Sequence, residues 1–206
     1  TGSNNTAVGD QALEASTTGQ QNVAFGSGAL TSNTTANYNN AIGAFTLRDN
    51  TTGGSNTALG HGALLVNTTA SNNTGVGFNA LISNTTGDVN TAVGSYAMAA
   101  NTTGSSNAAF GYHALDANTT GSQNTALGRA ALTSATTASS NTACGFGTLH
   151  NTTTGANNTA VGDVALTMNT TGTQNTAVGT AALDANTTGN YNVAIGYNAL
   201  TTATTA

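Results

Sequence analysis

The pattern of apolar and polar residues repeats every 17 residues along this chain. The pentapeptide N-x-(A/G)-φ-G, in which φ is apolar, recurs without insertion or deletion, and its last glycine falls at Gly9, Gly26, Gly43, Gly60, Gly77, Gly94, Gly111, Gly128, Gly145, Gly162, Gly179 and Gly196. The consensus unit is N-T-A-φ-G-x-x-A-L-x-x-N-T-T-G-x-x. A unit this short cannot bury its own apolar face, so we expect stacked units to share one continuous core.

Each unit predicts short strands and corners rather than helices. Helical repeats need about 33 residues or more, and two glycines with a Thr-Thr pair leave little room for a helix. In the fourth unit we expect a first strand over residues 57–60 and a second around residues 63–64, with corners at G-x-x-A and N-T-T-G. The sequence therefore predicts an all-β fold, a parallel β-solenoid (β-roll) of twelve 17-residue coils that spans residues 1–206 as one repetitive shaft. Equivalent residues such as Leu64 and Leu81 are expected to be vertical neighbours.

Two apolar positions of the unit are assigned to the interior. The φ position is apolar in every unit, at Val8, Phe25, Ile42, Leu59, Val76, Val93, Phe110, Leu127, Cys144, Val161, Val178 and Ile195. We expect these side chains and the leucine of the second strand to point inward, each contributing about 1.5–3 kcal/mol on burial. Cys144 then counts as a small core residue. Alternation along the strand would place the preceding alanine outside, where a smooth alanine surface would let identical chains pack as a homo-oligomer.

An asparagine stands four residues before every repeat glycine, at Asn5, Asn22, Asn39, Asn56, Asn73, Asn90, Asn107, Asn124, Asn141, Asn158, Asn175 and Asn192. In a parallel, in-register stack such amides can hydrogen-bond along the axis as a ladder. Asparagine also tolerates the left-handed backbone of tight corners. We therefore expect a structural asparagine ladder. At the repeat glycine we expect a positive backbone dihedral angle φ or a close approach of another backbone segment.

Composition excludes several classes of function. Charged residues make up 4% of the chain, the net charge is −5, and Arg48 and Arg129 are the only Lys or Arg residues. Nucleic-acid binding and attachment to anionic membranes both need clustered cations, and no run of 18 apolar residues could insert into a bilayer. Residues 3–206 comprise twelve whole periods without an atypical capping repeat, so we expect part of a longer array or a subunit that stacks end to end.

Residues that could carry catalysis or bind metal do not converge in the pattern. His61, His113 and His150 fall at three different positions of the unit, and we interpret each as a solvated substitution. Glu14, Asp116, His150 and Asp184 share one position, but the nearest are two coils apart, about 10 Å. No calcium, zinc or phosphate-loop spacing occurs. We expect no enzyme activity, no metal and no cofactor.

Two alternatives to a plain shaft remain open. Threonine arrays in a solenoid of low charge suggest ice binding, although adjacent threonines in an extended strand point to opposite faces. N-x-(S/T) sequons suggest a glycan-coated filament if their corner points outward. They recur in phase at Asn33, Asn50, Asn67, Asn84, Asn101, Asn118, Asn169 and Asn186, with Asn151 one position early.

The units NTAVGDQALEASTTG, NTALGRAALTSATTA and NVAIGYNALTT resemble repeats of phage tail-fibre-like and bacterial surface proteins. Residues 192–196 are also similar to the N-S-V-A-I-G motif in the heads of trimeric autotransporter adhesins, whose repeat is shorter. The resemblance implies left-handed parallel β-rolls packed as homotrimers, in extracellular fibres of a virion or cell surface. We expect such a tail fibre, adhesin stalk or surface filament to contact a host-surface glycan or receptor at its tip or at variable corners such as Tyr112-His113 and Tyr197-Asn198.

Overall fold

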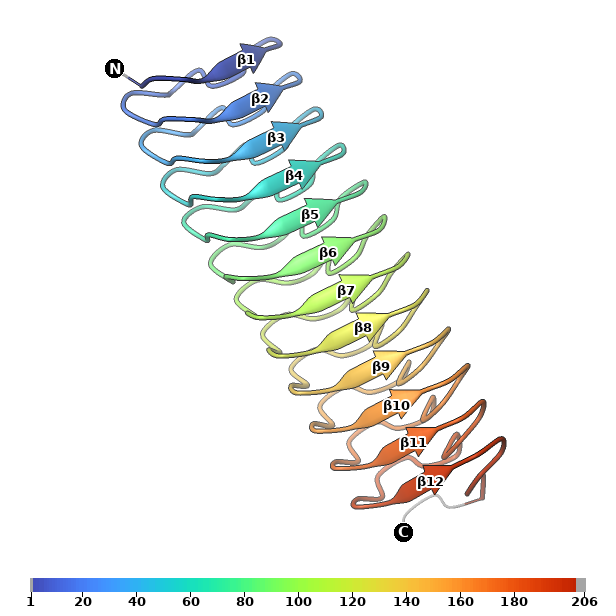
Figure 1. Cartoon of the computed structure of the whole chain (residues 1–206). Coiled ribbons are helices and arrows are strands. Elements are labelled where there is room, and N and C mark those ends of the chain that lie inside the picture. Colours follow the sequence, from blue (N-terminus) through green and yellow to red (C-terminus); the bar gives the residue numbers. More distant parts are fainter. Residues whose placement is uncertain (1, 203–206) are drawn as a thin grey trace.

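The chain is a parallel β-solenoid in which each 17-residue unit forms one coil, as the sequence predicts. The computed structural model describes residues 2–202. Figure 1 shows the coils stacked along one rod, from the blue N-terminal end to the red C-terminal end. Each coil carries one strand of three residues: β1 (Thr6–Val8), β2 (Val23–Phe25), β3 (Asn40–Ile42), β4 (Thr57–Leu59), β5 (Thr74–Val76), β6 (Thr91–Val93), β7 (Ala108–Phe110), β8 (Thr125–Leu127), β9 (Thr142–Cys144), β10 (Thr159–Val161), β11 (Thr176–Val178) and β12 (Val193–Ile195).

The strands form a single sheet in sequence order, and every neighbouring pair is parallel with a register of one period. Val76 of β5, for example, is paired with Val93 of β6, and β1 to β12 follow one another without a crossover. Backbone bonds between coils continue outside the strands: Leu64 N–H donates to the carbonyl of Ala80 at 3.0 Å. The prediction that equivalent residues stack directly on one another is confirmed. Below, coil n is the coil that contains βn.

The second strand expected around A-L is wrong, because this segment is a turn. The leucines of this position, with Met98 in coil 6, have φ between 49° and 57°, in the left-handed region. That conformation costs an L-residue about 1–2 kcal/mol. The side chain offsets this strain, since from Leu30 to Leu183 it is fully buried, which contributes about 1.5–3 kcal/mol. The back of each coil is therefore a leucine-anchored turn instead of a flat second sheet.

The inward and outward positions of the strand are also the reverse of the expectation. From β2 to β12 the middle residue of the strand is buried. The apolar residue at the third position, which is the φ position of the consensus unit, faces outward or is half-buried. Phe25 is 56% exposed, whereas Ala24 beside it is 0% exposed. The coil is too thin for a larger side chain: at Gly75, which replaces the alanine, an added Cβ would lie 3.4 Å from Leu64 Cγ. One methyl group fills the space between strand and leucine.

Because these positions are reversed, two further predictions are also wrong. Cys144 is not a core residue, because it occupies the third position of β9 and is half-buried on the outer surface of the sheet. The alanines are not a surface for packing identical chains either, since they form the core of the solenoid together with the leucines. Any contact between chains at this sheet must involve the larger φ side chains.

Candidate functional site

The asparagines before the repeat glycines form a continuous ladder along the rod. Asn107 is typical: its Oδ1 accepts the backbone N–H of Asn124 at 2.9 Å, and its Nδ2 donates to the carbonyl of Gly121 at 2.9 Å. The same bond, from the backbone N–H of one asparagine to the side-chain Oδ1 of the asparagine in the preceding coil, recurs in every pair from Asn5–Asn22 to Asn175–Asn192. The ladder is structural, because these amides satisfy backbone groups at the N-T-T-G corner.

The sequon asparagines form a second ladder beside the first. Asn118 Nδ2 donates to Asn101 Oδ1 at 2.7 Å and to Gly121 O at 3.0 Å, so Gly121 O accepts amides from both ladders. All eight in-phase sequon asparagines are 0% exposed. The outward corner that a glycan coat requires is therefore absent from the folded coils. Asn151 is half-buried, because Thr152 takes its place in the buried row.

The first and third residues of the twelve strands make up what we call the outer sheet face. Its third positions form an apolar row along the whole rod. Nine of the twelve side chains in this row are exposed, and Val76, Val93 and Cys144 are half-buried; the exposed ones are Val8, Phe25, Ile42, Leu59, Phe110, Leu127, Val161, Val178 and Ile195. Soluble monomers rarely expose contiguous apolar surface of this extent. The sequence pattern did not reveal this face, because the apolar character of the φ residues predicted that they belong to the core.

A column of aromatic rings lies at the corner that follows the strands, in coils 3 to 7. Successive ring centroids are 5.1–5.7 Å apart from Phe45 through His61, Phe78 and Tyr96 to His113. The Tyr96 and His113 rings are nearly parallel, at 5°. Because the rings contact one another along the rod, neighbouring rings cover much of each other's faces. The column therefore fits a role in holding adjacent coils together better than a role as a stacking platform for a ligand.

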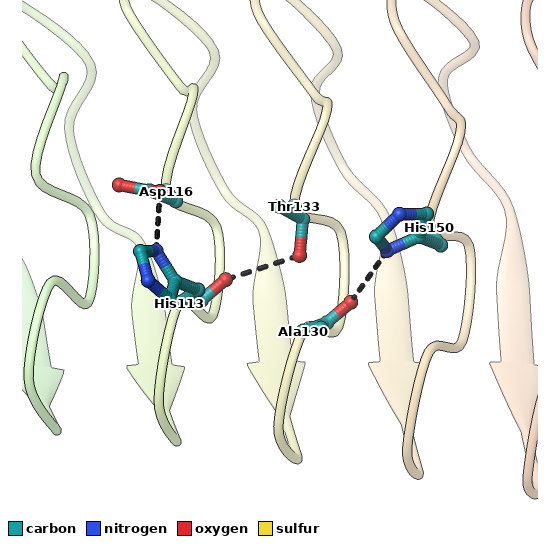
Figure 2. A network of polar contacts seen from close by, with 5 residues as sticks. All are labelled: His113, Asp116, Ala130, Thr133 and His150. Carbon is teal, nitrogen blue, oxygen red and sulfur yellow. Dashed lines mark hydrogen bonds and ion pairs between the residues drawn. The ribbon is translucent and has the colours of Figure 1, made fainter.

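His61 is exposed, as the sequence predicts, although its ring contacts Phe45 and Phe78, whereas His113 and His150 are half-buried and make polar contacts. His113 Nδ1 lies 2.6 Å from Asp116 Oδ2, and the Thr133 hydroxyl donates to the carbonyl of His113 at 3.1 Å (Figure 2). Figure 2 also shows His150 directed at the preceding coil, where its Nδ1 lies 3.4 Å from the carbonyl of Ala130. The Thr133 and His150 contacts join successive coils, whereas the His113–Asp116 contact lies within one coil. Within residues 2–202 no three His, Cys, Asp or Glu side chains are grouped to hold a metal ion.

The two arginines differ in their partners. Arg48 forms a bidentate pair with the neighbouring Asp49, with Nε–Oδ1 at 2.7 Å and Nη2–Oδ2 at 2.9 Å. The hydrogen bond to Asp49 raises the pKa of Arg48 above its ordinary value. Arg129 has no carboxylate partner in the part of the chain that the structure describes, and its guanidinium lies over the ring of Phe146, 5.5 Å from the centroid. It is the one arginine free to pair with an external anion.

Comparison of this chain with protein-family models, with curated proteins and with solved structures finds no match. Among residues 2–202 no helix is long and apolar enough to cross a bilayer.

Proposed function

We propose that this chain is the shaft of an extracellular fibre, in which copies pack side by side in parallel through the outer sheet face. The apolar row of that face is the observation that supports the proposal, because nine large side chains along it are exposed. Eleven strand spacings of about 4.8 Å make the face about 53 Å long. A contact strip about 15 Å wide along it would cover roughly 800 Å², the area per partner of a standard interface.

The occupant that fits this face is another copy of the same chain. The face is equally apolar from one end of the rod to the other, and carries no cation and no carboxylate to recognise a charged partner. Three parallel copies, each contributing its one apolar row to a common axis, would bury all three rows in a closed arrangement. We therefore propose a homotrimer, a geometry that the resemblance to adhesin heads also implies. The rod would then act mechanically, as a spacer for surface attachment.

Leu127→Asp should dissociate this assembly into single chains. Its side chain is 48% exposed in the apolar row, so a carboxylate there would be buried without a partner when chains associate. We expect sedimentation equilibrium to give three chain masses for the native protein and one for the variant. Thr120→Asp, at an exposed corner position, is the matched control and should leave the trimer intact. A native protein that is monomeric throughout the accessible concentration range contradicts the proposal.

The native thiol of Cys144 provides a second measurement of the same assembly. It lies within the apolar row and is half-buried in the single chain. In the native oligomer we expect a maleimide reagent to modify it slowly, and faster in Ile42→Asp, which places a carboxylate in the same apolar row six coils away from Cys144. Equal rates in the two proteins would show that the outer sheet face is not the interface. Electron micrographs of the native protein should show straight rods, and rods longer than one chain would indicate end-to-end stacking.

Ice binding is a second candidate, and one observation favours it. The first positions of the strands place threonines outward on the same sheet as the apolar row, as at Thr57, Thr74 and Thr91. This array is separate from the Thr-Thr corner. Bulky rings at Phe25 and Phe110 interrupt its flatness, so we place it second. A freezing point equal to the melting point, with unshaped ice crystals, would eliminate this candidate.

A further inference from the structure

A cavity of about 310 Å³ opens at the corner of coils 8 to 10. It exists because small residues occupy the position two after the repeat glycine, Ala130 in coil 8 and Gly147 in coil 9. The same position carries an aromatic ring in coils 6 and 7 and Val164 in coil 10. The cavity therefore lies directly beyond the aromatic column, where two successive coils omit the large side chain. Its volume is at the lower end for small-molecule sites, about 300–1,000 Å³.

One side of this cavity carries the unpaired cation. Arg129 and Phe146 occupy the position directly after the repeat glycine in coils 8 and 9, and both line the cavity. Because Phe146 supports the guanidinium from one direction, the fork of Arg129 remains available to a ligand. A planar guanidinium with free N–H groups binds carboxylates in bidentate geometry.

The other side offers neutral polar groups. The Nδ1–H of His150 is directed at the carbonyl of Ala130, which leaves Nε2 without a protein partner within the described chain. The Thr167 hydroxyl and the Gly147 carbonyl also make no hydrogen bond to any of residues 2–202. Thr133 and His150 bond to the preceding coil from this position, whereas Thr167 does not. Thr167, His150 and Gly147 all line the space, so its lining includes a donor–acceptor hydroxyl and two acceptors, as the hydroxyl groups of a sugar require.

Two acidic residues lie outside the lining of the cavity, on the side away from Arg129. Asp163 follows Phe146 in the same row, two coils from Arg129, roughly 10 Å at the parallel strand spacing. Asp184 lies one coil beyond Thr167, and its Oδ1 is buried without a hydrogen-bond partner among the described residues. The arginine end at coil 8 therefore carries the positive charge, and the two carboxylates lie at coils 10 and 11. An anionic group must lie at the arginine end and neutral hydroxyls at the other.

We propose that this cavity binds one carboxylate-bearing monosaccharide unit, such as a hexuronate or a nonulosonate, of a surface glycan. The carboxylate would pair with Arg129, the apolar C–H face of the ring would contact Phe146 and Val164, and hydroxyls would bond to Thr167 and Gly147 O. This inference names a ligand and goes beyond the proposed shaft function. It does not rest on assembly, since every group of the cavity belongs to one chain.

The test measures binding of D-glucuronate and N-acetylneuraminate to the full chain by saturation-transfer NMR, with D-glucose as the uncharged counterpart of glucuronate. We expect one of the two acids to bind with a dissociation constant on the order of 1–10 mM, and glucose at least tenfold more weakly. Arg129→Gln should weaken the acid about tenfold or more. Arg48→Gln, which removes the paired arginine, should leave binding unchanged.

Ala130→Phe tests the cavity independently of charge. Phe45 occupies the equivalent position with φ 59°, and Ala130 has φ 58°, so the substituted coil has a precedent within the chain. Circular dichroism should show an intact solenoid while binding is lost. The proposal is overturned if neither acid binds, if glucose binds as well as the acid that binds, or if Arg129→Gln and Ala130→Phe bind like the native protein. Because Leu127→Asp leaves the cavity intact, its monomer should still bind the acid, so failure of the assembly proposal and failure of this one give different results.

Discussion

Gly111→Ala should lower the free energy of unfolding by about 3 kcal/mol or more, through strain and overpacking together. Gly111 has φ 141°, which an L-side chain rarely adopts. An added Cβ would lie 2.5 Å from the carbonyl oxygen of Gly128 and 2.6 Å from its carbonyl carbon. These atoms belong to the backbone of the next coil and cannot rotate away. The coils must therefore separate locally, which breaks the bond from Gly128 N–H to Phe110 O at 2.8 Å.

Denaturant unfolding followed by circular dichroism measures this loss. Gly54→Ala is the matched control: Gly54 has no positive φ, an added Cβ would lie 3.1 Å from the nearest atom, Asn37 O, and Ala156 occupies the equivalent position in coil 9. We expect the control to change stability by less than about 1 kcal/mol. Because each coil contacts only its neighbours, damage at coil 7 could also divide unfolding into two transitions. Equal stability of Gly111→Ala and Gly54→Ala would refute the claim that adjacent coils approach too closely at this position for any side chain.

The period of the chain predicts the fold because repetition itself constrains the geometry. Twelve equal units with no insertion are equivalent only if each makes one coil. Each strand from β1 to β11 is then paired with the next strand in a register of one period. A helix is excluded by the glycines and the length of the unit. The asparagine ladder is predictable on the same basis, since identical amides one period apart must be neighbours along the axis.

The direction of the strand residues was not predictable from hydrophobicity, because adjacent positions are both apolar. The variation of side-chain volume between coils could have distinguished the buried position from the exposed one. The middle position is alanine in eleven coils and Gly75 in one, whereas the third position ranges from Cys144 to Phe110. A buried site in a repeated coil has one fixed volume, so it tolerates little variation. An exposed site has no such limit, and its variability marks the outer sheet face.

The leucine turn was missed for a different reason. Leucine disfavours the left-handed region, so sequence rules assign A-L to a strand. In the structure the cost is outweighed because a left-handed residue turns the chain inward and buries the whole side chain, as at Leu115. The cavity at Arg129 was missed because it depends on which side chains are absent from a corner, Ala130 and Gly147 being unremarkable in the unit. Tertiary burial decides both features.

Asn107→Ala should lower the free energy of unfolding by about 2–4 kcal/mol, because it leaves a buried donor without a partner. The Asn107 side chain accepts the N–H of Asn124 at 2.9 Å, and no other acceptor is positioned for that group. The carbonyl of Gly121 loses one of its two amide donors and keeps the bond from Asn118 at 3.0 Å. Asn107 has no positive φ, so alanine introduces no backbone strain. The loss therefore measures the side-chain ladder alone.

Two other asparagines make this experiment quantitative. Asn40 is exposed in the single chain at the first position of β3, where β7 has Ala108, but it lies on the outer sheet face. The three variants are therefore compared in the monomeric Leu127→Asp background, where Asn40→Ala should have an effect within about 0.5 kcal/mol. Asn73 accepts the N–H of Asn90 at 2.9 Å, but its Nδ2 has no partner among residues 2–202. Asn73→Ala should therefore be less destabilising than Asn107→Ala, since only the bond accepted from the Asn90 N–H is lost. Denaturant unfolding of the three variants should rank Asn107 first, Asn73 second and Asn40 last. If Asn107→Ala were as stable as Asn40→Ala, the turns and apolar core alone would hold the coils in register, and the asparagine ladder would contribute nothing to the rod.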